Sequence, residues 1–520
     1  MELACRIVML IAFAVYAAAQ AVYYTHMLQL NSYRPERYRR WCLENARRIL
    51  TGGRLIFPLL GAAWAVAWRL IGLDPVWLFA GAAALALTGA WVNRPRKAKK
   101  PLVVTARVKR LFATQIILLL LCGAALWMLP VWIGVLIYAA LGWLLFLWVA
   151  LSNRVNIPAE KAVARWYVND AGKRLRSMPD LIVIGITGSY GKTSTKNFLH
   201  ALLSARYNVL MTPESYNTTM GVVRTVRERL KPSHQVFIAE MGAKNPGDIQ
   251  EICDLVHPRY GMITSIGEQH LETFKTVENI VRTKFELADS LPADGVAFLN
   301  ADNDLIRSRP VSGKAVTYGV QPGADYVATD IAVDGQGSRF TVTAPNGEQA
   351  AFVTRLLGAH NIQNLVGCVA VAHTLGIPLK ELVYPVRLLK PVEHRLQLLP
   401  NGYIDDAYNS NPAGFRSALD VLGAFDAQRV LVTPGMVELG ERQEALNREL
   451  GQYAAAKCDW AILVGEKQAP PLRQGLLDGG FSPQRIHVAP TLQEGLAFLA
   501  TLPSDKKRIV LLENDLPDNF

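Results

Sequence analysis

The chain of 520 residues is long enough for about three domains of ordinary size, and 51% of its residues are hydrophobic. Its net charge of +12 is concentrated at one end, because residues 1–150 carry 17 Lys or Arg against 4 Asp or Glu and the remainder is close to neutral. A nucleic-acid-binding domain presents a basic face, so this distribution argues against a nucleic-acid partner.

Five apolar stretches in the first part of the chain each approach the ~20 residues that cross a bilayer. They cover residues 7–24, 55–73, 76–92, 111–129 and 131–151. The second is the weakest, since it contains Pro58 and Arg69. The first is either a span or a signal peptide, because Arg6 precedes an apolar run that ends in small residues. We expect an α-helical membrane domain over residues 1–152.

Basic residues gather in two of the connections between these stretches, 31–54 and 93–110, whereas the connections at 72–75 and Pro130 contain no Lys or Arg. Cytoplasmic loops of membrane proteins are enriched in Lys and Arg. Five spans then predict a multi-pass plasma-membrane protein with its N-terminus outside and residues 152–520 in the cytoplasm. The basic segment 31–54 either sets topology alone or also contacts an anionic lipid headgroup or a lipid-linked phosphate.

A polar connector, 153–180, leads to an apolar strand at 181–186 and then to a Gly-rich loop that ends in Gly191-Lys192-Thr193 and opens a helix. This context is typical of a phosphate-binding loop, in which backbone N–H groups cradle phosphate, the lysine adds charge and the threonine hydroxyl reaches Mg²⁺. Ile186 stands where the general P-loop pattern has its first glycine. The match to that general pattern is therefore incomplete.

Two further strands are expected beside this loop, at 235–239 and 260–266. The first ends at Glu240, the second leads to His270, and Lys284 follows in a helix. Ligands of open α/β sheets bind at the carboxyl ends of the strands, so Glu240 is well placed to hold a divalent cation. A lone histidine is more often structural, and a lysine on a helix is ordinarily solvated.

These residues together resemble the Mur ligase family, the amino-acid ligases of peptidoglycan synthesis, and within it the branch that adds D-alanyl-D-alanine. The family's phosphate loop also lacks the first glycine. The motifs that carry the resemblance are Thr187–Thr193, Ala239–Gly242, Pro246–Ile249, Glu268–Glu272, Lys284–Glu286, Gly358–Asn364, Asp405–Pro412 and Glu438–Gly440. They cover about residues 181–515 in the family's order.

The resemblance implies a site for ATP and two Mg²⁺ ions. The implied nucleotide contacts are Thr187, Gly188, Ser189, Gly191, Lys192, Thr193, Ser194, Asn361, Arg395 and Asp406. The implied metal ligands are Thr193, Glu240, His270 and a carbamylated Lys284, and the implied catalytic residues are Lys192, His270 and Lys284. The implied substrate contacts are Asn217, Asn409 and Asn411. Two plainer interpretations stay open, Lys284 as a solvated helix lysine and Asn361 as a cap or turn residue.

The expected fold is thus a helical membrane domain followed by α/β: a P-loop central ATPase domain with a mostly parallel sheet over 181–398, and a C-terminal Rossmann-like domain over 399–520. The expected function is an ATP-dependent, C–N bond-forming ligase of cell-envelope precursor synthesis that works through an acyl phosphate and releases ADP and phosphate. Its partners would be a cell-wall precursor or lipid-linked carboxylate acceptor, an amino acid or dipeptide as amine donor, and membrane lipids.

Three departures from the family leave the substrate open. Only about 28 residues separate the last apolar stretch from the phosphate loop, where soluble members have a domain for the uridine diphosphate sugar. Asn217-Thr218 replaces a pair of asparagines, and the last strand ends in Glu513-Asn514-Asp515 rather than Lys-Gly-Ser. The alternatives are a ligase for another envelope polymer and a non-catalytic nucleotide-sensing membrane protein.

Overall fold

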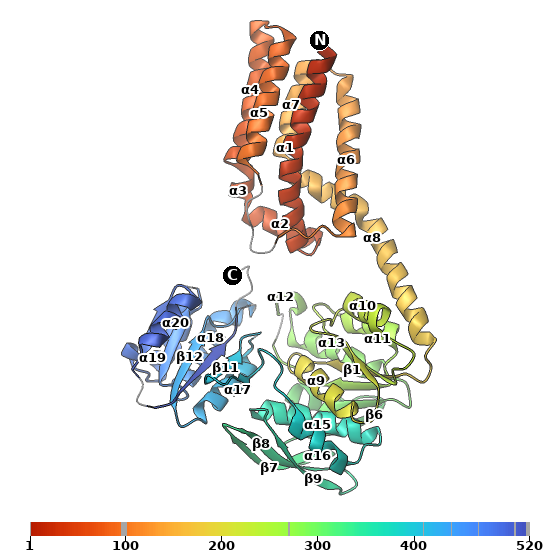
Figure 1. The fold of residues 1–520 in the computed structure, drawn as a ribbon, viewed down its shortest axis with the longest axis vertical. Coiled ribbons are helices and arrows are strands. Elements are labelled where there is room, and N and C mark those ends of the chain that lie inside the picture. The colour runs from red at the N-terminus through yellow and green to blue at the C-terminus, as the bar shows by residue number, and fades with distance from the viewer. Residues whose placement is uncertain are drawn as a thin grey trace. The chain divides into compact units, whose positions relative to one another are not determined.

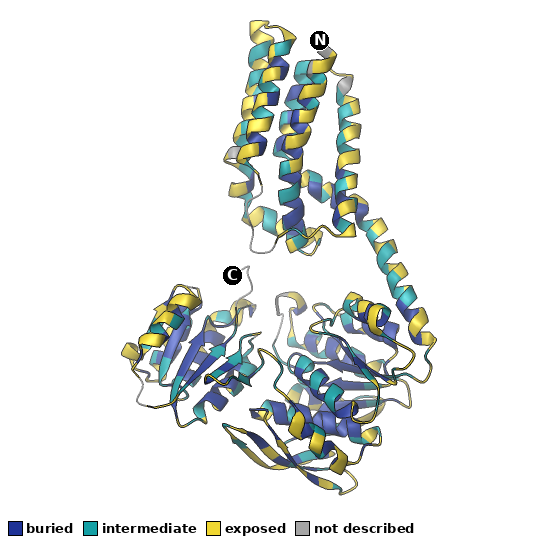
Figure 2. Ribbon diagram, viewed as in Figure 1, coloured by how far each residue is buried: buried dark blue, intermediate teal, exposed yellow. Residues whose placement is uncertain are grey.

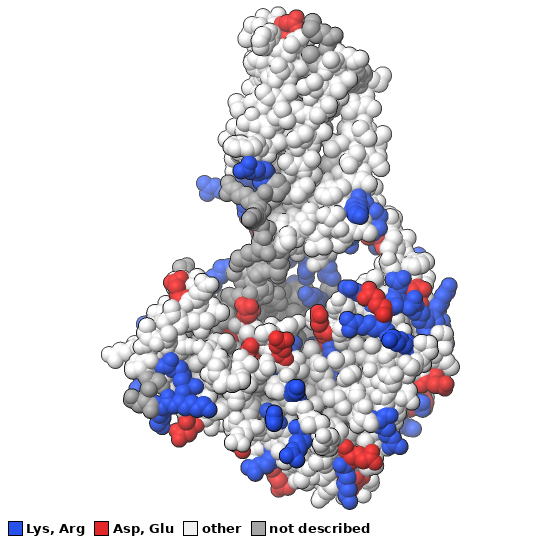
Figure 3. Space-filling view, in the orientation of Figure 1, with Lys and Arg blue, Asp and Glu red and all other residues white. Residues whose placement is uncertain are grey.

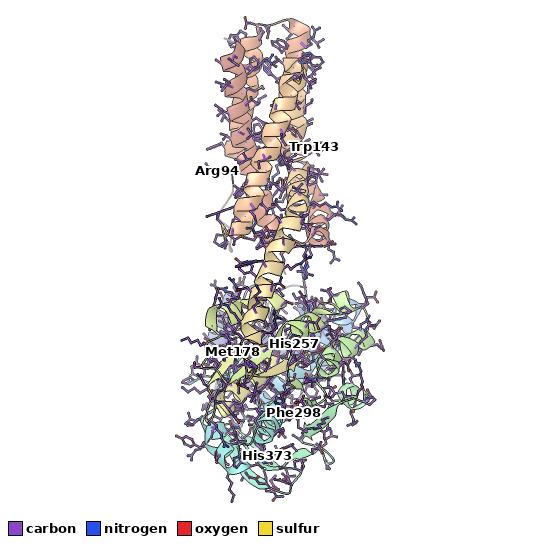
Figure 4. All side chains as sticks on the ribbon, turned by 90° about the vertical axis from the view of Figure 1, so that its right-hand side faces the viewer. Arg94, Trp143, Met178, His257, Phe298 and His373 are labelled. Atoms are coloured by element: carbon purple, nitrogen blue, oxygen red, sulfur yellow. The ribbon has the colours of Figure 1, made fainter. Side chains whose placement is uncertain are left out.

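The protein forms two compact units in the computed structural model, Met1–Trp166 and Tyr167–Phe520 (Figure 1). The structure describes residues 2–94, 101–268, 271–408, 410–437, 439–465, 467–503 and 506–515. The long helix α8 (Leu145–Arg176) contains the boundary between the units and ends just before Met178, where the chain turns toward the first sheet (Figure 4).

The first unit is helical. Besides the start of α8, its helices are α1 (Glu2–Leu30), α2 (Pro35–Glu44), α3 (Ala46–Leu50), α4 (Gly53–Ile71), α5 (Pro75–Val92), α6 (Ala106–Trp127) and α7 (Val131–Trp143). Local signals set several ends: Gly72 ends α4 in a left-handed conformation, the Asp74 side chain caps α5 with Pro75 in its first turn, and Thr105 caps α6.

Four segments of this unit are long and apolar enough to cross a membrane: Arg6–Leu30, Ala46–Ile71, Pro75–Val92 and Ala106–Leu126. The predicted fifth span, 131–151, is not one straight helix, because α7 and α8 meet at a 75° bend. With 13 residues α7 is about 20 Å long, short of the ~30 Å hydrocarbon core, so α7 and α8 count as a fifth span only together. On the face shown in Figure 3, charged side chains are nearly absent from the long sides of this unit.

The second unit begins with a nine-stranded sheet of order β2-β3-β1-β4-β5-β6-β7-β8-β9. Its strands are β1 (Ile182–Thr187), β2 (Val209–Met211), β3 (Val236–Glu240), β4 (Tyr260–Ile263), β5 (Val296–Asn300), β6 (Lys314–Gly319), β7 (Tyr326–Asp334), β8 (Gly337–Thr343) and β9 (Gln349–Thr354). Pairing is parallel from β2 to β7 and antiparallel only at β7-β8-β9, which confirms the expected mostly parallel sheet. Ile186 pairs with Glu240 and Thr187 with Ile263, so three strands end together at one edge.

Helices cover both faces of this sheet. They are α9 (Lys192–Leu203), α10 (Thr219–Arg229), α11 (Asp248–Val256), α12 (Leu271–Phe274), α13 (Val277–Asp289), α14 (Asp304–Arg307), α15 (Ala359–Thr374) and α16 (Leu379–Leu388). One core packs α9, α15 and α16 against the sheet, and a second core packs α10, α11 and α13 against the opposite face. Figure 2 shows the strands and α15 buried between exposed outer surfaces.

A second, six-stranded sheet follows in the order β10-β11-β15-β12-β13-β14. Its elements are β10 (Gln397–Leu398), β11 (Tyr403–Asp406), α17 (Pro412–Gly423), β12 (Gln428–Thr433), α18 (Gln443–Ala454), β13 (Trp460–Val464), α19 (Ala469–Asp478), β14 (Ile486–Ala489), α20 (Leu492–Thr501) and β15 (Arg508–Glu513). All pairs except β10-β11 are parallel, and Asp406 pairs with Glu513 at the carboxyl ends of β11 and β15.

Candidate active site

The loop between β1 and α9 requires glycine at two positions. A side chain at Gly188, whose φ is +152°, would place its Cβ 2.1 Å from Thr264 Oγ1. Gly191 precedes the first residue of α9 with φ +81°, and a Cβ there would lie 2.9 Å from Asn364 Oδ1. The loop therefore passes close to two neighbouring segments while it opens the N-terminus of a helix, where backbone N–H groups favour anions.

The segment after β4 holds this loop in shape. Ser189 donates its backbone N–H to the Ser265 carbonyl at 2.7 Å, and its hydroxyl donates to the Gly267 carbonyl at 3.0 Å. The Tyr190 hydroxyl donates to the Glu268 carbonyl at 2.7 Å. These contacts hold the loop in its conformation, and nothing in the motif itself predicted them.

Lys192 is folded back onto its own loop. Its Nζ donates to the carbonyls of Gly188 at 2.8 Å and Ser189 at 3.2 Å. Burial lowers the pKa of Lys192 to about 8, against the opposing effect of the negative Glu240, and positive Arg395 lowers it further. A phosphate oxygen bound in the loop would stabilise the charged form.

Glu240 contacts two of the predicted residues and one lysine that was not predicted. Its Oε1 accepts hydrogen bonds from Thr193 Oγ1 at 3.2 Å and Asn217 Nδ2 at 3.1 Å, and its Oε2 lies 2.9 Å from Lys196 Nζ. Burial alone would raise the pKa of this carboxyl, but the charges of Lys196 and Lys192 outweigh it and the pKa is lowered. The side chain is therefore ionised beside the threonine that a phosphate loop offers to a metal.

Lys196 is a site residue that the sequence analysis missed. It and Glu240 form an ion pair in which each side chain is only 1% exposed, and its Nζ also donates to the Glu214 carbonyl. The available signal was its spacing, because a lysine four residues after Lys192 lies on the same side of the helix as the loop lysine.

Lys284 is buried on α13 and has no hydrogen bond or ion pair among the described residues. Burial, and next the positive charge of Lys192, lower its pKa to about 7. A solvated helix lysine is thus the wrong description of this side chain. With this pKa, Lys284 is partly neutral at physiological pH. The neutral amine is the form that reacts with carbon dioxide.

The predicted nucleotide contacts from later in the chain have local partners, and Arg395 is also near enough to act electrostatically on Lys192. Asn361 is buried at the start of α15, where its Nδ2 donates to the Leu357 carbonyl at 2.8 Å. The Arg395 guanidinium lies 4.4 Å from the Tyr408 ring centroid. Asp406 Oδ1 accepts the Leu396 N–H at 3.0 Å.

The remaining predicted residues have mixed outcomes. Asn217 contacts Glu240, as described above. Asn411 caps α17 by accepting the Gly414 N–H at 2.8 Å, so its side chain has a structural use. Ser194 is buried in the first turn of α9. His270 and Asn409 lie outside the described residues.

The donor set fits Mg²⁺ if phosphate and water complete it. Thr193 and Glu240 supply the hard oxygen ligands that Mg²⁺ prefers, and Mg²⁺ usually keeps several waters and binds substrate phosphates. Within the described ranges, no group of three or more His, Cys, Asp or Glu side chains forms a complete protein metal site. The site is therefore suited to a metal that arrives with a nucleotide.

Comparisons with known proteins place two family domains on the chain. Residues 186–372 match the Mur ligase middle domain, and residues 394–512 match the Mur ligase glutamate ligase domain. The UDP-N-acetylmuramoyl-tripeptide–D-alanyl-D-alanine ligase of Escherichia coli K12 is 34% identical over 294 residues, which are 55% of this chain and 65% of that protein. Its Bacillus subtilis counterpart is 30% identical over 302 residues, or 57% of this chain and 63% of that one. The chain thus spans somewhat less than two thirds of these relatives.

Solved structures agree with these matches. Crystal structure I of MurF from Acinetobacter baumannii has a TM-score of 0.61 at 28% identity, covering 68% of this chain and 77% of that one. MurF ligase from Thermotoga maritima in complex with ADP also has a TM-score of 0.61, at 26% identity, covering 68% of this chain and 80% of that one. The ordered motifs, the parallel sheets and both domain matches lead to one conclusion: this chain belongs to the Mur ligase family.

Proposed function

We propose that the protein is a membrane-anchored ligase that uses ATP to join a carboxylate to an amine. The observation that carries the proposal is that Lys192, Thr193 and Glu240 lie together at one Gly-rich loop, with the positive Arg395 and Lys284 near enough to interact electrostatically with Lys192. The helical unit before Tyr167 would anchor it through five spans, with the N-terminus outside and both sheets in the cytoplasm, where ATP is available.

In this proposal the loop is a P-loop that holds the ATP phosphates by backbone N–H groups and the Lys192 ammonium, with Ser194 and Thr187 in the same loop and helix turn. Asn361, Arg395 and Asp406 would contact the rest of the nucleotide. Thr193 and Glu240 would hold one Mg²⁺, and a carbamylated Lys284 with His270 a second, and these ions would neutralise phosphate charge. The second sheet would be a Rossmann-like domain that closes over the site and excludes water.

The proposed reaction has two steps. A carboxylate oxygen of the acceptor attacks the γ-phosphorus of ATP, the bond to the bridging oxygen breaks, and ADP leaves. The neutral amine of the donor then attacks the carbonyl of the acyl phosphate, and inorganic phosphate leaves as the amide forms. Neither step needs a protein nucleophile, so positioning and charge neutralisation by residues such as Lys192 provide the catalysis.

The names of the relatives suggest the kind of substrate. The named relatives join a UDP-N-acetylmuramoyl tripeptide to D-alanyl-D-alanine. For this chain we propose a cell-wall precursor as acceptor, soluble or lipid-linked, and an amino acid or dipeptide as donor, with Asn217, Asn409 and Asn411 on the substrate side.

The test is product formation by full-length protein purified in detergent. ATP and Mg²⁺ would be supplied with soluble and lipid-linked muramoyl peptides, each with D-alanyl-D-alanine or single amino acids, and products identified by mass. An amide product with stoichiometric ADP supports the proposal. Lys192→Ala should abolish turnover. Lys314→Ala should not, because Lys314 is exposed at the start of β6, among the amino ends of the parallel strands. Substantial turnover by Lys192→Ala would refute the loop assignment.

A further inference from the structure

A groove at the end of the first sheet takes no part in the proposed ATP site. It is lined by the end of β7, the start of β8, the end of β9 and the last turn of α16, and its volume is about 760 Å³. This volume lies within the ~300–1,000 Å³ of small-molecule sites.

The direction of the strands places this groove at the edge where ligands of α/β sheets bind. β7 is parallel to β6, and β9 is antiparallel to β8 and therefore points the same way as β7. The groove thus lies at the carboxyl edge of the sheet, as the phosphate loop does. Five strand spacings of ~4.8 Å separate β8 from β1, about 24 Å in all, so the two sites are distinct.

Positive charge dominates the lining of the groove. Its basic residues are Arg339, Arg355, Arg387 and Lys390, and its acidic residue is Asp334. An Arg339 nitrogen lies 3.7 Å from an Asp334 oxygen. The other three basic side chains form no ion pair or side-chain hydrogen bond with any residue that the structure describes. Charges of one sign in a single hollow reinforce each other's field, so the groove attracts anions.

The lining also indicates which anion fits. Arginine binds phosphate through two parallel hydrogen bonds, and a lysine adds a point charge. Tyr384 and Leu388 line the same groove from α16, although their side chains are 67% and 57% exposed. Arg387 and Leu388 follow Tyr384 by three and four residues, so all three lie on one side of the helix. An exposed aromatic ring beside unpaired arginines suits a phosphate chain that carries a flat ring.

An acidic peptide would use the same charges but needs a wider surface. A stable protein interface buries about 800 Å² on each partner, whereas these residues surround one hollow of small-molecule size. The observations therefore favour a small phosphorylated ligand.

We propose that the groove binds a nucleoside diphosphate. The diphosphate contacts Arg355, Arg387 and Lys390, which lack other partners among the described residues. The base lies on the Tyr384 ring. The protein then holds two nucleotides at once, one in the groove and one on the phosphate loop. This goes beyond the proposed function, because binding in the groove is measured without turnover and does not depend on amide formation.

The test is calorimetric titration of uridine diphosphate into the full-length protein in detergent, after a non-hydrolysable ATP analogue with Mg²⁺ has saturated the phosphate loop. One equivalent should bind. Affinity should fall at least tenfold in Arg355→Gln and in Arg387→Gln, because each removes a phosphate contact. Arg229→Gln is the matched control and should bind as wild type does, since Arg229 is exposed in the last turn of α10 as Arg387 is in that of α16.

Two further measurements separate the parts of the ligand and the two sites. Tyr384→Ala should weaken uridine diphosphate about tenfold and leave inorganic pyrophosphate unchanged, because pyrophosphate has no base to stack. Lys192→Ala should bind uridine diphosphate as wild type does, so a failure of the ATP site and a failure of the groove are distinguishable. Unchanged binding of the ATP analogue would show that the groove variants are folded.

Three results would overturn the proposal. They are no binding of uridine diphosphate, wild-type affinity in both arginine variants, and tighter binding of hexaglutamate that is lost in the same variants. The last result would assign the groove to an acidic peptide instead.

Discussion

The ion pair between Lys196 and Glu240 shows how much one buried contact decides in this site. Both side chains are 1% exposed, so neither charge is hydrated, and the pair holds only while both members are present. Glu240 also accepts hydrogen bonds from Thr193 and Asn217. Lys196 therefore orients the carboxylate that contacts the phosphate loop. In the proposed mechanism Lys196 is a positioning residue.

Replacing Lys196 with Met should destabilise the protein by about 3–5 kcal/mol, because it leaves a buried carboxylate without a cation. Denaturant unfolding of the detergent-solubilised protein measures this. The exposed Lys314→Met is the matched control and should stay within about 0.5 kcal/mol of wild type. The double variant Lys196→Met with Glu240→Gln should recover part of the loss, since it removes the unpaired charge; no recovery would contradict the ion-pair explanation.

Asp406 and Glu513 are two acidic residues that lie side by side at the carboxyl ends of β11 and β15. Burial raises the pKa of Asp406 from 3.8 to about 6, and burial together with the negative Asp406 raises the pKa of Glu513 well above its usual value. Glu513 Oε1 accepts the Ser410 hydroxyl at 2.6 Å, while Oε2 is buried without a partner among the described residues. A shared proton between the carboxyl groups accounts for that arrangement.

This pair predicts a pH-dependent stability with a defined sign. Both pKa values are higher in the folded state, so the contribution of this pair to folding stability is full at low pH and falls as pH rises, through about 6 for Asp406. Glu513→Gln, whose amide hydrogen replaces the shared proton, should flatten the fall in unfolding temperature across that pH. Asp478→Asn is the control, because the pKa of Asp478 is lowered and it stays ionised throughout this range. A wild-type slope in Glu513→Gln would refute the shared proton.

At the scale of elements, the turn from β1 into α9 shows why a short motif carries so much information. The turn needs a positive φ at Gly191 and close approach to α15 through Asn364. Two elements far apart in the chain therefore constrain one residue. The sequence motif indicates the positive φ at Gly191. Only the packing of α15 against α9 brings Asn364 close to it.

Gly191→Ala should weaken nucleotide binding by roughly tenfold or more, because its Cβ would push Asn364 and the loop apart. The matched control is Gly347→Ala in the turn between β8 and β9, which has φ +82° against +81° but no atom within 4 Å of the added Cβ. The control should lose only about 1 kcal/mol of stability from backbone strain. Calorimetric binding of a non-hydrolysable ATP analogue measures the effect. Equal binding by both variants would show that the contact with Asn364 has no role.

At the scale of the whole molecule, the bend between α7 and α8 decides the topology. Four spans would leave both ends of the chain on one side of the membrane, whereas five place them on opposite sides. We propose that α7 and α8 form one broken span, because four spans would put either the basic loops or the proposed ATP site on the wrong side of the membrane.

Reporter fusions test this directly. A phosphatase reporter, active only outside the cytoplasm, should be active at the N-terminus, and a fluorescent protein that matures only inside should be bright at the C-terminus. The reversed pair of fusions is the control and should be inactive. Both termini reporting the same side would show four spans and would refute the predicted orientation.

Much of the architecture and part of the site were determined by the sequence alone. Four of the five predicted membrane spans are single helices, and the Val- and Ile-rich runs predicted the parallel strands. The loop motif predicted Lys192 and Thr193, and the end of the next strand predicted Glu240 at the same sheet edge, because strand period, helix length and glycine chemistry are local. Lys196, Asn364 and the Asp406–Glu513 pair were not predictable in this way. Their roles depend on which strands and helices become neighbours, and on burial, which alone turns an ordinary lysine or carboxylate into one with a shifted pKa.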